Sequence, residues 1–353
     1  MHKGPICCEH ASKSQVQLRF ARHLTRISTP VEIDFGVRVL LEEGLPACVR
    51  ELIDIDNAFY ADHAASFSAT RSAPWQGWEQ LAELLRRRGG PWAGEGGDGT
   101  GGTPAAVHVL DLACGNLRFE RFLREAFPEL TFTFHAYDSC PDLVEEGAGE
   151  SRPASADEGT DGGGRLDVHF HELDVLDALL KRMDASPAGG ETNGPAVRAA
   201  AGRENDSTED PLLDVPPCAL TACFGFMHHV PGGALRRAVL DALVDATAPG
   251  GIVAVSFWRF MDDPRLARKA RTADAAAAAD PPFEGFSPIA LEPGDHFLGW
   301  QDDTGPLRYC HHFDEAEIDE LASGIAPRAR ETARFSADDA SDTLNRYLVL
   351  QKL

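Results

Sequence analysis

The sequence predicts a doubly wound α/β fold with a mostly parallel sheet. Short apolar segments with strand character alternate with helical patterns along most of the chain, a rhythm typical of sheets covered by helices on both faces. Three strand segments are each closed by an aspartate, and the first is followed by a small-residue turn and a helix. The carboxyl ends of parallel strands meet at one edge of the sheet, where ligands bind. We therefore expect a ligand site at that edge.

The centre of this prediction is residues 107–123, VHVLDLACGNLRFERFL. An apolar strand leads into Asp111, then into the turn Ala113-Cys114-Gly115-Asn116, and a helical pattern follows at once. Backbone N–H groups of such a turn and of the helix N-terminus face a ligand, and a glycine lets the backbone approach it closely. The segment contains neither G-x-G-x-x-G nor a Gly-Lys-Ser/Thr sequence, so it is not a typical dinucleotide or phosphate loop.

The remaining elements follow from periodicity and turn signals. Helices are predicted upstream at 45–65 and from about 78 to 88. Downstream, strands are predicted at 131–137, 168–173, 218–224, 252–258 and 344–351, with helices at 233–247 and 315–322. The second strand is followed by Asp138 and the third by Asp174.

We predict one domain over residues 37–353 with low-complexity insertions near 89–103, 145–167, 184–216 and 262–282. The first is rich in glycine, and the last is charged and rich in alanine, either helical or disordered. Residues 1–36 are expected to form a basic, disordered arm; an organelle-targeting peptide and a misplaced start codon are the alternatives.

Composition excludes several classes of function. The 353 residues carry a net charge of −23, so DNA is not an expected partner. The insertions at 145–167 and 184–216 each hold seven acids against two arginines, which leaves −13 for the remainder. No apolar run approaches the length of a membrane span, so no membrane partner is expected. Eight cysteines without a CxxC spacing favour a reducing, cytoplasmic location.

The strand-end acids indicate what the ligand is. A carboxylate at Asp138 can accept hydrogen bonds from both hydroxyls of a ribose, and one at Asp174 can accept from an adenine amino group. A single aspartate in such a place is more often a turn or N-cap residue. Three in succession, with Gly115 in the first loop, favour a nucleotide-like ligand.

These residues resemble class I S-adenosylmethionine (SAM)-dependent methyltransferases. DLACGN (111–116) is similar to the family's first motif, AYDSC (136–140) to its second-strand acid, HELDVLD (171–177) to its third, and the PGG turn at 249–251 to the turn before its fifth strand. The resemblance covers about residues 104–258. It implies a seven-stranded Rossmann-like sheet with N-terminal lid helices, SAM as cofactor and methyltransferase activity (EC 2.1.1.-).

Carried over position by position, the resemblance implies these cofactor-binding residues: Asp111, Ala113, Cys114, Gly115 and Asn116 in the first loop, Asp138 and Ser139 at the ribose, Asp174 and Val175 at the adenine, and Phe224 and Gly225 beside the transferred methyl. The family usually has glycine where this chain has Ala113 and Leu117. The larger departure is Leu117, which suggests a non-catalytic scaffold as an alternative.

The flanking segments are similar to one branch of the family. FYADHAASFSATRSAPWQGW (59–78), FMHHV (226–230) and RYCHHFDEAEIDEL (308–321) resemble the wobble-uridine tRNA carboxymethyl methyltransferases and their uncharacterised bacterial-type relatives. That branch has RYYH where this chain has RYCHH. The resemblance implies tRNA as methyl acceptor and a small activator subunit as a partner. A small-molecule carboxyl or O-methyltransferase is the alternative, and the acidic charge is no obstacle to it.

Methyl transfer from a sulfonium is an in-line displacement, so alignment is the main task of the enzyme. A carboxylate acceptor is already ionised and needs a fork of donors rather than a base, which Arg71 offers. His228 or His229 is expected to orient the acceptor. The alternatives are a structural ion pair for Arg71 and a packing role for one of the two histidines.

Other side chains are expected to be structural. Packing is predicted for the tryptophans Trp75, Trp78 and Trp300, and segment 300–313 is expected to close the acceptor side. The histidine pairs at 169/171, 228/229 and 311/312 lack a supporting cysteine or carboxylate pattern, so no metal site is predicted.

Overall fold

The computed structural model of the chain describes residues 48–93, 106–150, 167–185 and 212–353. The arm predicted over residues 1–36 lies outside these ranges, as do the middle parts of the first three predicted insertions.

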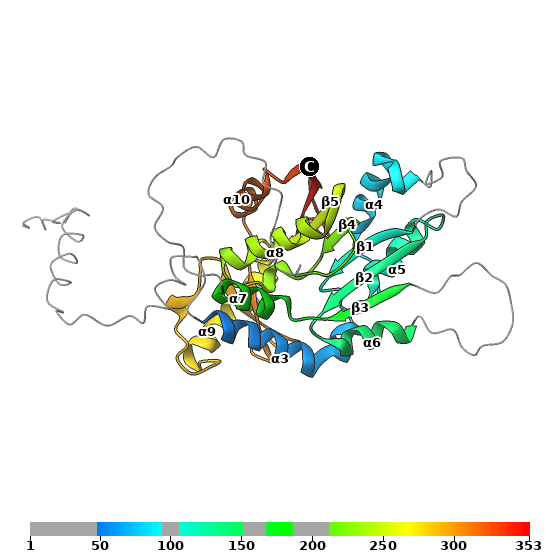
Figure 1. The fold of residues 1–353 in the computed structure, drawn as a ribbon. Helices are drawn as coiled ribbons and strands as arrows, with labels where there is room; N and C mark the ends of the chain where they lie inside the picture. The colour runs from blue at the N-terminus through cyan, green and yellow to red at the C-terminus, as the bar shows by residue number, and fades with distance from the viewer. Residues whose placement is uncertain (1–47, 94–105, 151–166, 186–211) are drawn as a thin grey trace, which may run out of the picture.

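A seven-stranded sheet forms the centre of the fold (Figure 1). Its strands are β1 (Val107–Leu112), β2 (Phe132–Asp138), β3 (Val168–Glu172), β4 (Cys218–Cys223), β5 (Thr247–Trp258), β8 (Ala329–Ala337) and β9 (Asn345–Lys352). Their order across the sheet is β3-β2-β1-β4-β5-β9-β8, and β9 is the one strand of this sheet that runs opposite to the other six. The predicted doubly wound, mostly parallel Rossmann-like sheet is confirmed.

Helices cover both faces of the sheet. They are α3 (Val49–Ser68), α4 (Gln76–Arg88), α5 (Arg118–Ala126), α6 (Pro141–Glu150), α7 (Val175–Ala185), α8 (Gly233–Ala246), α9 (Pro264–Ala279) and α10 (Glu315–Ile325). Short 3-10 turns are η2 (Gly90–Ala93), η3 (Met227–His229), η4 (Phe260–Asp262) and η5 (Pro288–Ala290). Apolar side chains of α7, α8 and α10 pack on one face, and those of α4 and α5 on the other. No helix among the described residues has the length and apolarity needed to cross a membrane.

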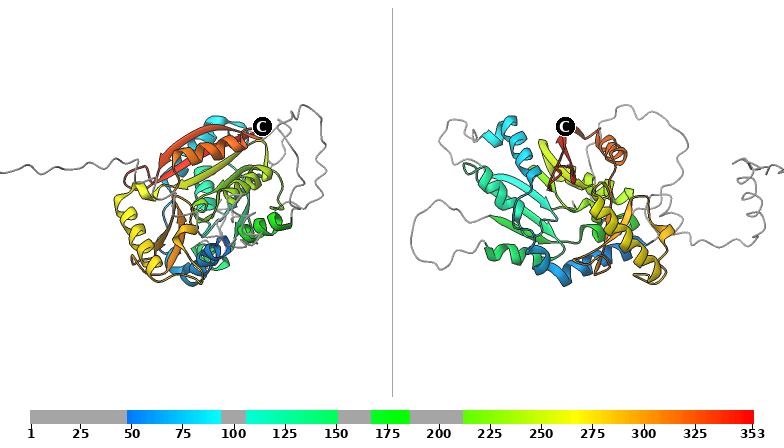
Figure 2. Two further views of the ribbon diagram at one scale, coloured as in Figure 1. Left: turned by 90° about the vertical axis from the view of Figure 1, so that its left-hand side faces the viewer. Right: turned by 180° about the vertical axis from the view of Figure 1, so that it is seen from behind.

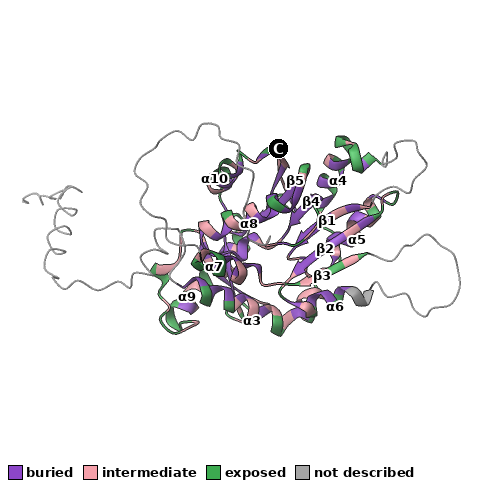
Figure 3. Ribbon diagram, viewed as in Figure 1, coloured by how far each residue is buried: buried purple, intermediate pink, exposed green. Residues whose placement is uncertain are grey.

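The two covered faces explain the apolar character of the central strands. On β1, Val109 belongs to the core on the α4–α5 side and its neighbour Leu110 to the core on the α7–α8 side. Both side chains are fully buried, as is most of the central sheet (Figure 3). A strand buried on both faces reads as a nearly continuous apolar run, which is why these segments were recognisable.

A hairpin and two helices lie beside the main sheet. β6 (Asp295–Gly299) pairs with the antiparallel β7 (Leu307–His311), α9 packs on β6, and α3 packs on β7 at one end and on α6 at the other (Figures 1 and 2). Thus α3 extends from the hairpin past the carboxyl ends of the parallel strands.

Several predicted insertions are ordered in part. For residues 262–282 the sequence allowed either a helix or disorder, and the structure shows the helix α9 there. Its buried alanines recur at helical spacing and face the hairpin: Ala267, Ala270, Ala273 and Ala277. Asp263 caps this helix by accepting a hydrogen bond from the N–H of Leu266 at 2.7 Å. Residues 145–150 belong to α6, 184–185 to α7 and 90–93 to η2. Low complexity therefore does not mean disorder here, because small side chains allow close helix packing.

Candidate functional site

A cavity of about 1150 Å³, part of it open to solvent, lies at the carboxyl edge of the sheet next to α3. All the predicted cofactor residues border it, namely Asp111, Ala113, Cys114, Gly115, Asn116, Asp138, Ser139, Asp174, Val175, Phe224 and Gly225. Arg71 and His229 border it as well, whereas His228 does not. The structure therefore brings together every predicted site residue except His228.

The turn after β1 is held by the acid at the end of β2. The N–H of Gly115 donates to Oδ2 of Asp138 at 2.9 Å, and the N–H of Cys140 donates to Oδ1 at the same distance. Burial raises the pKa of Asp138 above its usual value, and these two hydrogen bonds act in the opposite direction. The acid thus orders the loop and still presents its carboxylate to the cavity.

Leu117, where the resemblance led us to expect glycine, has a backbone conformation that favours glycine. Its φ is +59°, in the left-handed region, and Ala113 has φ +60° and Gly115 +54°. The Leu117 side chain is buried against Cys114, in a cluster that Val144 of α6 also joins. The turn therefore keeps a backbone that normally calls for glycine, and the buried leucine compensates for the strain.

Asp174 acts as the N-cap of α7. Its Oδ1 accepts from the N–H groups of Leu176 at 3.1 Å and Asp177 at 3.0 Å, while Oδ2 accepts from Asn57 Nδ2 at 2.7 Å. The capping alternative is thus realised in a residue that also borders the cavity. The bond to Asn57 ties α3 to this edge of the sheet.

A buried carboxyl pair lies behind the first turn. Asp111 borders the cavity and interacts electrostatically with Glu120 of α5, which is fully buried and whose two carboxylate oxygens have no hydrogen-bond partner among the described residues. Burial and the charge of Glu120 raise the pKa of Asp111 well above its usual value; burial raises the pKa of Glu120 to about 7. The pair therefore retains a proton close to neutral pH.

Arg71 provides positive charge on the α3 side of the cavity. Its guanidinium stacks over the Phe67 ring at 3.5 Å, and Nη1 donates to Oγ1 of Thr70 at 2.9 Å. Within the described part of the chain it forms no ion pair with a carboxylate, so the structural ion pair considered as an alternative is not seen there. Burial lowers its pKa to about 10, which leaves the side chain protonated at neutral pH. Arg71 is thus a charged donor available to a ligand.

His229 lies in a chain of hydrogen bonds that reaches the cavity. Its Nε2 is 2.9 Å from Oη of Tyr60, and its Nδ1 is 2.9 Å from both Oδ2 of Asp56 and the carbonyl oxygen of Tyr309. The other oxygen of Asp56 accepts from the N–H of Tyr309 at 2.9 Å. These contacts fix α3 to β7 and η3 and place Tyr60 at the cavity wall.

His228 packs behind His229. Its ring lies 4.0 Å from the His229 ring and 4.7 Å from that of Trp258, measured between centroids. Its Nδ1 is buried and has no hydrogen-bond partner. The expectation that one of the two histidines packs is met by His228.

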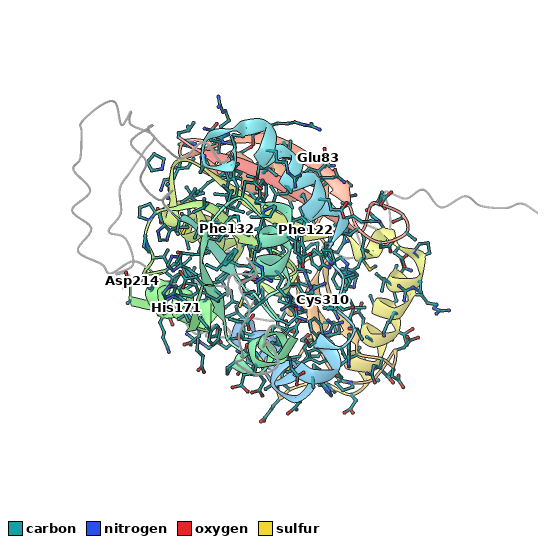
Figure 4. All side chains as sticks on the ribbon, turned by 90° about the vertical axis from the view of Figure 1, so that its right-hand side faces the viewer. Glu83, Phe122, Phe132, His171, Asp214 and Cys310 are labelled. Atoms are coloured by element: carbon teal, nitrogen blue, oxygen red, sulfur yellow. The ribbon has the colours of Figure 1, made fainter. Side chains whose placement is uncertain are left out.

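The histidine pair has a cysteine beside it. Single ligand atoms of His228, His229 and Cys310 all lie within 4.8 Å of one another, and the three side chains are buried. Figure 4 shows Cys310 in the interior. The cysteine comes from β7, far along the chain, so no local spacing pattern could reveal this group.

The tryptophans mainly pack, as predicted. Trp75 and Trp78 stack with ring centroids 5.3 Å apart and border the cavity, and Trp78 is buried. Trp300 contacts Phe59 and Phe67 of α3 but does not border the cavity.

Sequence reasoning missed the contribution of α3. Six of its residues border the cavity: Phe67 and Ser68 near its end, and, at helical spacing before them, Ile53, Asp56, Asn57 and Tyr60. Their spacing of three and four was visible in the sequence, but polar positions on a predicted lid helix carried no chemical signature. Arg118, at the start of α5, also borders the cavity and was missed.

No family model and no curated protein matches this chain. Solved structures that it resembles include a SAM-dependent methyltransferase from Methanosarcina mazei (13% identity, 70% of this chain and 93% of that one, TM-score 0.44). A second is the complex of DhpI with SAM and HEP (17% identity, 85% of this chain and 97% of that one, TM-score 0.45). A third is magnesium protoporphyrin IX methyltransferase from Synechocystis PCC 6803 with bound SAH (11% identity, 84% of this chain and 100% of that one, TM-score 0.45). Likeness at this level says nothing about the substrate.

Proposed function

We propose that this protein is a SAM-dependent methyltransferase that transfers the methyl group to an oxygen, most specifically to the carboxylate of a small molecule. The observation that carries the proposal is that the turn held by the Gly115–Asp138 hydrogen bond and the side chain of Arg71 line the same cavity. The first is suited to a nucleoside and the second to an anion.

The cofactor half follows from the acids. Each carboxylate oxygen of Asp138 has lone-pair capacity beyond its backbone hydrogen bond, so it can still accept from ribose hydroxyls. Asp174 and Val175 border the place expected for adenine. By the resemblance, Asp111 would lie at the methionine end of the cofactor, where the one negative charge left on the Asp111–Glu120 pair would favour the ammonium group and the sulfonium.

The acceptor half follows from Arg71. A guanidinium without a carboxylate partner among the described residues can bind an acceptor carboxylate through two parallel N–H donors. The acceptor is then already anionic, so the reaction requires alignment with the sulfonium rather than proton removal. His229, with Tyr60, would orient the second oxygen or its neighbour.

The tRNA acceptor remains a separate proposal based on the flanking motifs alone. A net −13 outside the two acidic insertions opposes binding to a phosphate backbone, so a tRNA substrate would require a basic partner such as the activator subunit. We favour a small molecule for this reason. The scaffold alternative loses its motivation if Leu117 supports the same turn as glycine.

Calorimetry with SAM and its demethylated product SAH tests the cofactor half. Micromolar binding of both is expected, and no heat at millimolar ligand would refute the enzyme proposals. The acceptor class is then tested with methyl-labelled SAM, a metabolite extract and bulk tRNA. Base-labile label in the small-molecule fraction supports a methyl ester on a carboxylate, whereas label confined to tRNA refutes the small-molecule proposal.

A further inference from the structure

We propose that His228, His229 and Cys310 form a binding site for a divalent transition metal ion, with zinc as the natural occupant. The proposal concerns residues behind the acceptor side of the cavity and does not depend on the proposed function.

The three side chains converge from two elements. His228 and His229 lie in η3, after β4, and Cys310 lies in β7, with ligand atoms no more than 4.8 Å apart. All three are buried, with exposed fractions of 8%, 4% and 0%. Because zinc–nitrogen and zinc–sulfur bonds are about 2.0–2.3 Å long, ligand atoms in a tetrahedral site lie roughly 3.3–3.7 Å apart. Side-chain shifts of about 1 Å would therefore close the site around an ion.

His228 is an independent sign of a missing ligand. A buried ring nitrogen without a hydrogen-bond partner is uncommon, because desolvating it costs free energy that no contact returns. A neutral imidazole with an available lone pair is the form that binds a metal.

His229 already has the outer contacts of a metal-binding histidine. Its Nδ1 is placed to donate to Asp56 and to the carbonyl oxygen of Tyr309, both at 2.9 Å. This fixes the tautomer in which Nε2 carries the lone pair, as a carboxylate commonly does for a histidine on zinc. Nε2 now faces the Tyr60 hydroxyl at 2.9 Å.

Cys310 supplies the thiolate. Binding of the ion would release the thiol proton to solvent, and the new negative charge would offset the positive charge of Arg308 on the same strand. Two imidazoles and one thiolate select zinc or a neighbouring transition metal over magnesium or calcium. Three protein ligands leave a fourth position for water or for a group entering from the cavity, which His229 and Tyr60 border.

Cobalt titration of metal-free protein tests the site. The full chain is used with Cys7 and Cys8 replaced by serine, so that no thiolate signal can come from that pair. We expect one equivalent of Co²⁺ to give a thiolate-to-cobalt charge-transfer band with tetrahedral visible bands, and zinc to displace it. Cys310→Ser should abolish the charge-transfer band, and Asp56→Asn should weaken binding about 10- to 100-fold.

Matched controls are His169→Ala, an exposed histidine on β3, and Cys48→Ser, a buried cysteine at the start of α3. Both should leave the spectrum unchanged. If Cys310→Ser does not fold, a crystal of the zinc-soaked parent protein decides, because an anomalous peak must lie between the three side chains. The proposal would be overturned if the parent protein showed no charge-transfer band on titration with Co²⁺. It would also be overturned if the band survived Cys310→Ser, or if the anomalous peak lay elsewhere.

Discussion

The backbone N–H of Gly115 donates a 2.9 Å hydrogen bond to the carboxylate of Asp138, which fixes the turn after β1 to the end of β2. One side chain therefore shapes the loop and borders the cavity. Replacement of Asp138 by alanine should weaken binding of both SAM and SAH by about 10- to 100-fold, because hydrogen bonds to a charged group are lost. Calorimetry measures this. Asp142→Ala, an exposed acid on α6, is the control and should bind normally; equal affinities for Asp138→Ala and wild type would remove Asp138 from the site.

Arg71 should separate acceptor binding from cofactor binding. Arg71→Lys retains the charge but loses the two-pronged donor, so we expect kcat/KM for a carboxylate acceptor to fall about 10- to 100-fold with SAM affinity unchanged. Arg71→Ala should abolish turnover. Arg86→Lys, on the exposed side of α4, serves as the matched control. Normal turnover by Arg71→Ala would show that the guanidinium does not hold the acceptor.

The buried carboxyl group of Glu120 should make stability depend on pH. Its pKa is about 7 in the folded protein against an ordinary value of 4.5. Between these values the unfolded chain has released the proton and the folded protein retains it, so the free energy of unfolding falls as the pH rises through this interval. Above pH 7 this group causes no further change.

Glu120→Gln removes that titration. Urea unfolding at about pH 5 and about pH 8 should show a smaller loss of stability for the variant than for wild type. Glu125→Gln changes an exposed acid on the same helix and should keep the wild-type difference. If Glu120→Gln shows the same difference in stability between the two pH values as wild type, Glu120 is not the group that holds the proton.

Replacement by glycine should change the stability of the protein in opposite directions at the two non-glycine residues of the first turn that have a left-handed backbone. Ala113 has φ +60° and a small side chain, so Ala113→Gly should stabilise the protein by up to about 1 kcal/mol. Leu117→Gly relieves similar strain but removes a buried side chain, so it should destabilise by about 1–3 kcal/mol. Thermal or urea unfolding gives both values. Stabilisation by Leu117→Gly would mean that the leucine contributes little packing.

Much of the fold was readable because its central strands are buried on both faces. The apolar run that ends at Asp111 and the shorter segments TFTFHAY and VHFHEL, which are followed by Asp138 and Asp174, marked the strands and the edge at which they end. The same acids predicted the cavity wall, since parallel strands bring their carboxyl ends together. The residues predicted to bind the cofactor are therefore neighbours in space for a reason that the sequence already contains.

The elements that were not predicted lack such a signal. Strand β8 has the sequence ARETARFSA and lies at the edge of the sheet, so its polar residues obscure the apolar pattern. The hairpin β6–β7 is buried by contacts with α3 and α9 that come from distant parts of the chain. Cys310 meets the histidine pair only through that hairpin, and His228 could not be separated from His229 without knowing the direction of η3.

The attachment of α3 has a consequence for how a ligand could enter and leave the cavity. Asp56, Asn57 and Tyr60 fasten this helix to β7, the start of α7 and η3, so lifting it would break several buried hydrogen bonds at once. The segment 69–74 between α3 and α4 is largely exposed and is held by two side chains: Asn116 donates to the carbonyl oxygen of Arg71 at 3.1 Å, and Arg118 donates to that of Ala73 at 2.8 Å. Under the proposed function, release of SAH should therefore proceed by displacement of this short connector, and its length and stiffness, rather than those of the helix, should set how long SAH stays bound.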